Sequence, residues 1–145
     1  MLLISHRGNL EFPDPTKENT IVQIEKAIKL GFDVEIDIWK DGENLLLGHD
    51  VGLNIVNMEW ILKNKDKLWI HCKHLEAFKF LDTKYDLNLF VHDTESVVIT
   101  TKGHRWYYPG NDSSGGICVL PEKFNKPIPN GTIGICTDFP FKFNH

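Results

Sequence analysis

The first half of the chain alternates short apolar runs with segments of helical periodicity. Apolar positions recur at spacings of three and four after Thr16 and stop at Gly31, a residue typical of helix C-caps. Asp41-Gly42 indicates a turn between two strands of a hairpin. The expected strands cover residues 2–5, 32–39, 45–47, 68–72 and 87–91, and the further helices cover 58–63 and 75–81.

The second half has a different pattern. From Val97 onward no helical period appears, and short strand-like runs at 97–101, 106–108, 117–120 and 133–136 are separated by Gly, Pro, Asn and Ser. Alternating strands and helices are typical of an α/β architecture with parallel strands. Because a complete eightfold barrel takes about 250 residues, an open sheet and a shortened barrel both fit the length. We expect one domain over residues 1–145, a reduced or incomplete TIM-like (β/α) barrel with its helices mainly in the N-terminal half.

Composition narrows the classes of partner. The 145 residues carry 16 basic and 20 acidic side chains, a net charge of −4, which disfavours nucleic acid as the main partner. No apolar run approaches the length of a membrane span, and the apolar start, residues 1–4, is too short for the core of a signal peptide. Three widely spaced cysteines predict neither a disulfide scaffold nor a cysteine zinc site. We therefore expect a protein of the reducing cytoplasm.

Candidate chemistry begins with the strand at residues 33–38. Side chains alternate faces along a strand, so Glu35 and Asp37 share the face opposite to its apolar residues. Two carboxylates about 7 Å apart on one strand face repel each other unless a cation lies between them. An edge strand with a solvated acidic face explains the same spacing.

The next predicted strand favours a site over that alternative. His71 and Lys73 share one face, and side by side with the acidic strand they would face its carboxylates. A structural ion-pair network stays open as the other reading. His6, His49 and His92 all follow predicted strands, and the carboxyl ends of parallel strands are where α/β proteins place their sites. His92-Asp93 and the aromatic group at 106–108 are further pocket candidates.

These residues resemble the N-terminal signature of the glycerophosphodiester phosphodiesterases, which belong to the phospholipase C-like phosphodiesterases. The signature is a strand ending in His-Arg-Gly, a Pro, a Glu-Asn-Thr that opens a helix, a Gly before a strand with Glu-x-Asp, an Asp-Gly turn and a His-Asp. The chain has these elements in order over its first third, and residues 134–140 are similar to the family's last strand, which ends in Thr-Asp-x-Pro. The matching residues are His6-Arg7-Gly8, Pro15, Glu18-Asn19-Thr20, Gly31, Glu35-Ile36-Asp37, Asp41-Gly42 and His49-Asp50.

The resemblance implies a TIM-barrel hydrolase of phosphodiesters that uses a divalent metal ion. In that case His6 and His49 are the acid–base pair, and Arg7 and Lys73 contact the phosphate. Glu35 and Asp37 are metal ligands, and Glu18 has a supporting role. The substrate class is a small phosphodiester, and the resemblance connects the protein with lipid metabolism.

Two departures from the family pattern leave alternatives open. The family's Ile-Glu-x-Lys segment corresponds here to Ile70-His71-Cys72-Lys73, so His71 stands where the family has a further metal-binding Glu. Mg²⁺ and Ca²⁺ prefer oxygen ligands, whereas an imidazole favours Mn²⁺ or another transition metal. The chain is also short for the family. The alternative function is therefore a catalytically degenerate barrel that binds a phosphate ligand, or that associates with a second copy as a homodimer.

Overall fold

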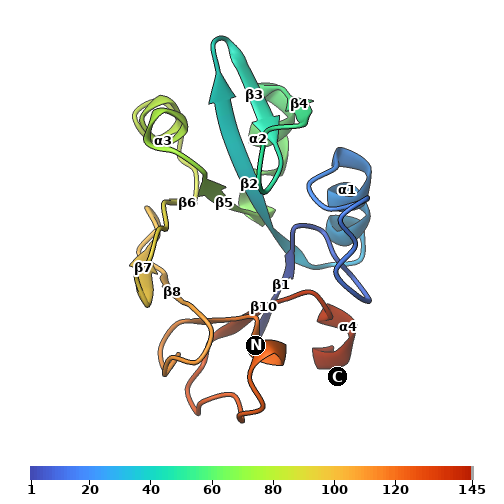
Figure 1. Cartoon of the computed structure of the whole chain (residues 1–145), viewed down its shortest axis with the longest axis vertical. Helices are drawn as coiled ribbons and strands as arrows, with labels where there is room; N and C mark the ends of the chain where they lie inside the picture. Colours follow the sequence, from blue (N-terminus) through green and yellow to red (C-terminus); the bar gives the residue numbers. More distant parts are fainter. Residues whose placement is uncertain (145) are drawn as a thin grey trace.

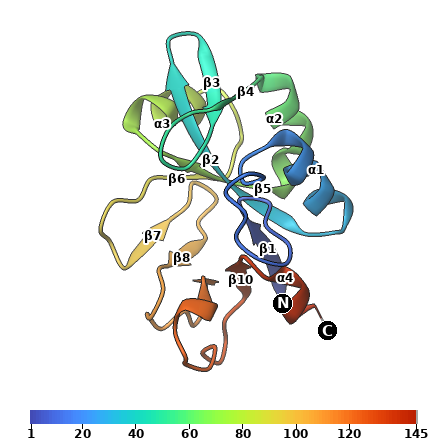
Figure 2. The same cartoon turned by 45° about the vertical axis from the view of Figure 1, so that its right-hand side comes forward.

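The computed structural model describes residues 1–144, and its ten strands form one curled mixed sheet (Figures 1 and 2). The strand order is β4-β3-β2-β1-β10-β9-β8-β7, and β5 pairs with both β2 and β6. The bounds are β1 Leu2–His6, β2 Asp33–Asp41, β3 Asn44–Leu47, β4 Asn54–Val56, β5 Leu68–Cys72, β6 Leu89–Phe90, β7 Val97–Ile99, β8 Arg105–Tyr107, β9 Ile117–Val119 and β10 Gly134–Thr137.

Helices are few and short. The four α-helices are α1 Ile21–Lys29, α2 Met58–Asn64, α3 Leu75–Asp82 and α4 Pro140–Phe143, and two 3₁₀ turns are η1 Lys65–Lys67 and η2 Pro121–Lys123. No helix among residues 1–144 is long and apolar enough to cross a membrane.

The expected reduced TIM-like (β/α) barrel is wrong. Such a barrel alternates parallel strands with covering helices, whereas this sheet is mixed and curls into a half-barrel. The pairs β2–β3, β3–β4 and β7–β8 are antiparallel. Between β6 and β10 the connections are loops and the turn η2, because that part of the sequence lacks the apolar periodicity of a helix. The curl brings the segment after β7 against β6, where the Thr101 N–H donates to the Leu89 carbonyl at 2.9 Å.

The predicted strands and helices themselves lie close to their expected places. The first helix begins at Ile21 and not near Thr16, because Thr20 caps it by accepting a hydrogen bond from the Gln23 N–H. Residues 14–19 form instead a loop, in which Asp14 accepts hydrogen bonds from the Thr16 N–H and hydroxyl.

Two apolar clusters lie on opposite faces of the sheet. Val34, Ile36 and Ile38 of β2 are fully buried in the outer cluster, against α1, α2 and α3. The inner cluster includes Trp69 and Trp106 and fills the concave side. Because side chains alternate along β2, the same strand that buries three aliphatic residues outward directs Glu35 and Asp37 into the curl.

Candidate functional site

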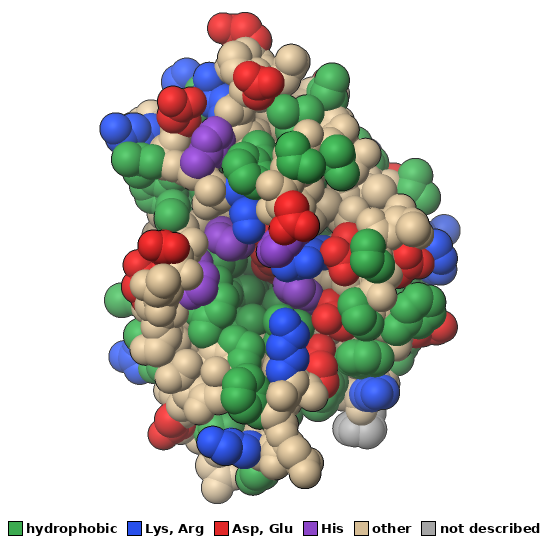
Figure 3. Space-filling model, viewed as in Figure 1, with side chains coloured by type: hydrophobic (Ala, Val, Ile, Leu, Met, Phe, Trp, Pro, Cys, Tyr) green, Lys and Arg blue, Asp and Glu red, His purple; other side chains and the backbone are tan. Residues whose placement is uncertain are grey.

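A cavity of about 330 Å³ opens on the concave side of the sheet, near the C-terminal ends of its parallel strands. Figure 3 shows this hollow, with histidine side chains around it. Seven of the eight site residues predicted from the sequence line it: His6, Arg7, Glu35, Asp37, His49, His71 and Lys73. The structure thus brings together groups from β1, β2, β5 and the loop after β3.

The strand register explains why these groups meet. His6 of β1 lies beside Glu35 of β2, and Asp37 lies beside His71 of β5. Neighbouring residues in adjacent strands point to the same face of a sheet. His71 is further oriented by stacking on the Phe90 ring, at 5.0 Å between centroids.

The two carboxylates are deeply buried and not equivalent. Asp37 is within 3.2 Å of Arg7 Nε, and its other oxygen is 3.0 Å from His71 Nδ1. Burial by itself would raise the pKa of Asp37, but His71 and Arg7 outweigh it, so the pKa lies well below its ordinary value. Glu35 has only distant partners, at 3.9 Å from His6 and His71. Burial and the nearby Asp37 therefore raise the pKa of Glu35 well above its ordinary value.

Asn19 fixes Asp37 through two hydrogen bonds. The Asn19 amide donates to Asp37 Oδ2, and the Asp37 N–H donates to Asn19 Oδ1, both at 3.0 Å. The residue has a φ of 54°, a left-handed conformation that asparagine tolerates better than most residues. This contact connects the loop before α1 to the floor of the site.

Arg7 is held in an unusual conformation. Its φ is 58°, and its N–H donates to the Glu35 carbonyl at 2.9 Å, so the chain turns sharply after β1. Gly8 follows with a φ of 87°, a backbone conformation that glycine adopts readily because it has no Cβ atom. The turn places the guanidinium between Asp37 and Glu18, whose carboxylate accepts from Arg7 Nη1 at 3.2 Å. Glu18, the eighth predicted residue, lies outside the cavity lining and positions Arg7.

His6 has a carboxylate partner that the sequence interpretation did not assign. His6 Nδ1 is 2.7 Å from Asp138 Oδ1, at the end of β10. An ionised carboxylate only accepts hydrogen bonds, so Nδ1 carries a proton in this contact, and in the neutral form of the ring Nε2 is the acceptor. Burial of Asp138 is outweighed by its hydrogen bond from His6, which lowers the pKa of Asp138. The Thr-Asp-x-Pro segment was the sequence signal for this residue.

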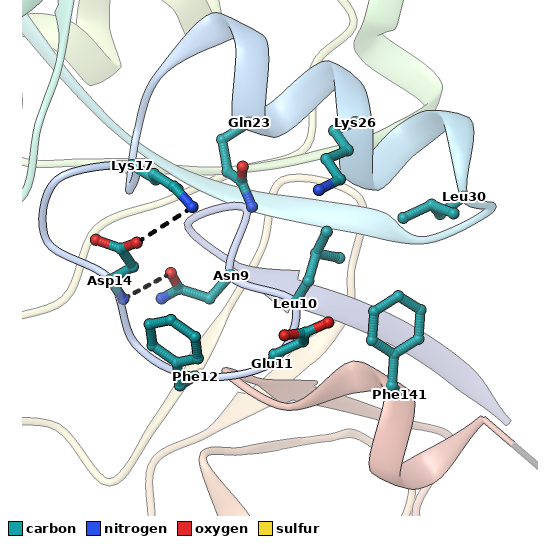
Figure 4. Close-up of a pocket in the computed structure, with 10 residues that line it drawn as sticks. All are labelled: Asn9, Leu10, Glu11, Phe12, Asp14, Lys17, Gln23, Lys26, Leu30 and Phe141. Atoms are coloured by element: carbon teal, nitrogen blue, oxygen red, sulfur yellow. Dashed lines mark hydrogen bonds and ion pairs between the residues drawn. The ribbon is translucent and has the colours of Figure 1, made fainter.

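Asn9 connects this pair to the loop before α1. Its amide nitrogen donates to Asp138 Oδ1 at 2.8 Å and to Glu18 Oε1 at 3.1 Å. Figure 4 shows its other side, where the Asp14 N–H donates to Asn9 Oδ1 and Lys17 pairs with Asp14. The sequence interpretation gave Asn9 no role, since its contact with Asp138 joins residues 129 positions apart.

His49 is more exposed than His6. Its side chain is 42% exposed, and Nδ1 is 2.8 Å from the Asp50 carboxylate. Partial burial and the positive charges of Arg7 and Lys73 lower the pKa of His49, against the opposing effect of Asp37. The ring is therefore a readily available proton donor once it is protonated.

Replacing Lys73 tests this electrostatic coupling. Lys73→Met removes a positive charge that disfavours imidazolium, so the pKa of His49 is expected to rise. In the unaltered protein the pKa of His49 lies below its ordinary value. In Lys73→Met the titration midpoint of His49 should move up towards that of a free imidazole, about 6.5. NMR titration of the imidazole protons measures it, and Lys126→Met is the matched control. An unchanged midpoint in Lys73→Met would contradict the coupling.

Three side chains can form a metal centre. Glu35, Asp37 and His71 each offer a ligand atom, and these atoms lie within 4.8 Å of one another. Glu35 Oε2 and Asp37 Oδ1 are buried and have no hydrogen-bond partner among the described residues. Asp37 Oδ1 keeps its ion pair with His71, but buried carboxylate oxygens without a well-directed hydrogen bond are costly, and a cation would satisfy both.

Comparison with protein-family models, with curated proteins and with solved structures finds no match for the chain. The resemblance to glycerophosphodiester phosphodiesterases stays a prediction from the sequence.

The opposite wall of the cavity differs in character from the ionic one. It is formed by Trp106, Tyr108, Pro109, Val119 and Leu120, together with Lys123 of η2. The ring of His92 stacks on Tyr108, and Asp93 lies at the same edge of the opening. The sequence indicated His92, Asp93 and the aromatic group as pocket candidates, but nothing in the pattern pointed to Lys123.

Proposed function

We propose that the protein hydrolyses a small phosphodiester of the glycerophosphodiester type in a metal-dependent reaction. The observation that carries the proposal is one cavity in which His6, His49, Arg7 and Lys73 surround two buried carboxylates, each with an oxygen that accepts no hydrogen bond. Phosphodiester cleavage requires neutralisation of negative charge, a base for the nucleophile and an acid for the leaving group. The cavity contains a candidate for each requirement.

Glu35, Asp37 and His71 would hold the metal ion. The carboxylate oxygens that accept no hydrogen bond fit a divalent cation, and the imidazole favours Mn²⁺ or another transition metal over Mg²⁺ or Ca²⁺. When bound, a divalent ion there would offset negative charge on the non-bridging phosphate oxygens. Arg7 and Lys73 add positive charge on the same side of the cavity and orient the phosphate.

His6 is suited to act first as the base. Its Nε2 is the free acceptor of a ring that Asp138 orients through Nδ1. In the reaction that the resemblance implies, a hydroxyl of the substrate next to the phosphate attacks phosphorus, and His6 Nε2 takes its proton. The bond from phosphorus to the other alcohol breaks, and His49 donates a proton to that alkoxide.

The second half of the reaction returns both histidines to their starting states. The products of the first half are a free alcohol and a cyclic phosphate. His49 then takes a proton from water as the water oxygen bonds to phosphorus. His6 returns its proton to the substrate oxygen released by ring opening, which completes the hydrolysis.

The test is turnover by the purified protein. Glycerophosphodiesters and bis(4-nitrophenyl) phosphate are incubated with the protein and Mn²⁺, Mg²⁺, Ca²⁺ or a chelator, and the released alcohol is quantified. Release with Mn²⁺ that the chelator abolishes supports the proposal. No release from any diester with any of these ions would overturn it.

A phosphate-binding module without catalysis is the second candidate. The contacts of Asp37 with Arg7, His71 and Lys73 favour it, since they neutralise this carboxylate without a metal ion. Saturable binding of a phosphodiester without release of alcohol, unaffected by a chelator, would support this candidate instead.

The proposed setting is the reducing cytoplasm. Cys72, Cys118 and Cys136 are free, which accords with such a compartment. A small phosphodiester is the proposed binding partner. Light scattering measures the molar mass in solution and so tests whether the protein forms a homodimer.

A further inference from the structure

One charged side chain in the cavity has no part in the reaction described above. Lys123, an exposed residue of the turn η2, lines the cavity together with Leu120 and Val119. Of the three cationic residues that line the cavity, Arg7 pairs with Glu18 and Asp37, and Lys73 lies 3.9 Å from Asp37. Lys123 forms no ion pair with any residue in the range 1–144.

The turn that carries Lys123 is held firmly in place. Leu120 is buried and has a φ of 48°, a left-handed conformation that a leucine adopts only at an energetic cost. Glu122 anchors the turn to the end of β10, since its carboxylate accepts from the Thr137 hydroxyl at 3.0 Å and the Asp138 N–H at 2.9 Å. The residue that orients His6 therefore also fixes the turn that presents Lys123.

The wall around Lys123 is a poor receptor for a quaternary ammonium group. Such cations bind to open aromatic faces. The ring of His92 covers one face of Tyr108, at 3.3 Å between centroids. Trp106 is only 2% exposed and packs against Trp69 and Phe90. What this wall offers is apolar surface and the unpaired ammonium group of Lys123.

Asp93 is the other unpaired charge at the opening. Asp93 is exposed, and its N–H donates to the Glu95 carboxylate. An ammonium group on the substrate would be attracted there. The anchored turn of Lys123 and the covered aromatic faces favour a negatively charged group on the substrate over a positively charged one.

We propose that Lys123 determines substrate specificity by binding a second anionic group, on the alcohol that the reaction releases. The substrate class is then a phosphodiester whose leaving alcohol carries a carboxylate or a phosphate, as well as the diester that is cleaved. This inference rests on the proposed function. In this arrangement Val119 and Leu120 contact the carbon atoms between the two anionic groups of the substrate, and Lys123 binds the anionic group that is not cleaved.

The experiment compares three diesters of glycerol 3-phosphate. Their second alcohols are glycolate, which carries a carboxylate, glycerol, which is neutral, and choline, which is a quaternary ammonium. KM and kcat are measured with Mn²⁺ for the unaltered protein, for Lys123→Ala and for Lys123→Glu. Lys126→Ala, which removes an exposed lysine that lines a different cavity, is the control.

Lys123→Ala is expected to raise KM about tenfold for the glycolate diester only, the effect of losing one contact between charged groups. Lys123→Glu should reverse the order of the glycolate and choline diesters, and kcat should change little. An equal rise in KM for all three diesters would mean that Lys123 contacts the phosphate that is cleaved, and would overturn the inference. A preference of the unaltered protein for the choline diester would also overturn it, in favour of Asp93.

Calorimetric binding separates the two proposals. The affinities of the three diesters are measured in the presence of Ca²⁺ for the same variants, independently of turnover. Absence of turnover would overturn the proposed function, whereas the affinity ratio still tests Lys123. Equal affinities of the glycolate and glycerol diesters for the unaltered protein would overturn the role of Lys123 alone.

Discussion

His6→Ala is expected to lower kcat for phosphodiester hydrolysis by about 10²–10⁴-fold, the range that a positioned acid–base group contributes. The side chain is one of four imidazoles that line the cavity, and Asp138 holds it through Nδ1, which leaves Nε2 to face the substrate. His71 does not take this place, because its Nδ1 is directed at Asp37, at 3.0 Å. KM should change far less, since in the proposed function the charged phosphate contacts would come from Arg7 and Lys73.

The measurement is steady-state kinetics on one diester with saturating Mn²⁺. His104→Ala is the matched control, because His104 packs against Trp69 and lines a cavity at the opposite ends of the strands. Its kcat should stay within about twofold, the scale on which distant surface changes act. Equal kcat values for His6→Ala and His104→Ala would show that His6 takes no part in proton transfer.

Glu35→Gln is expected to weaken Mn²⁺ binding by about 100-fold or more. Even residues that only support metal ligands cost about 10–100-fold when they are replaced, and Glu35 would be a ligand itself. An amide keeps the shape of the side chain but loses its negative charge. Isothermal titration calorimetry gives the affinity, and the electron paramagnetic resonance signal of free Mn²⁺ provides a check without turnover.

Two further variants sharpen this result. Asp41→Asn, at the exposed end of the same strand, should leave Mn²⁺ affinity unchanged. His71→Glu replaces the imidazole with an oxygen ligand and should shift the preference towards Mg²⁺ and Ca²⁺. Mn²⁺ affinities that are equal in Glu35→Gln and Asp41→Asn would exclude a metal centre at this carboxylate.

The local structure of the chain follows closely from its sequence. Period-two alternation at 33–38 predicted which side of β2 is apolar, and Val34, Ile36 and Ile38 are indeed fully buried on one face. The predicted convergence of Glu35, Asp37, His71 and Lys73 at one cavity also matches the structure. Both depend on short-range geometry, since alternation along a strand and pairing between neighbouring strands are properties that residue spacing encodes.

The tertiary structure alone decided how the sheet is completed. The sequence indicated a barrel of helices and strands, but the second half closes with loops, a hairpin between β7 and β8, and a core of stacked aromatic rings. Local periodicity does not encode the order of strands from distant segments, and β1 pairs with β10 across more than 120 residues. For the same reason the contact of His6 with Asp138, and the place of Lys123 in the cavity, depend on long-range packing and not on local periodicity.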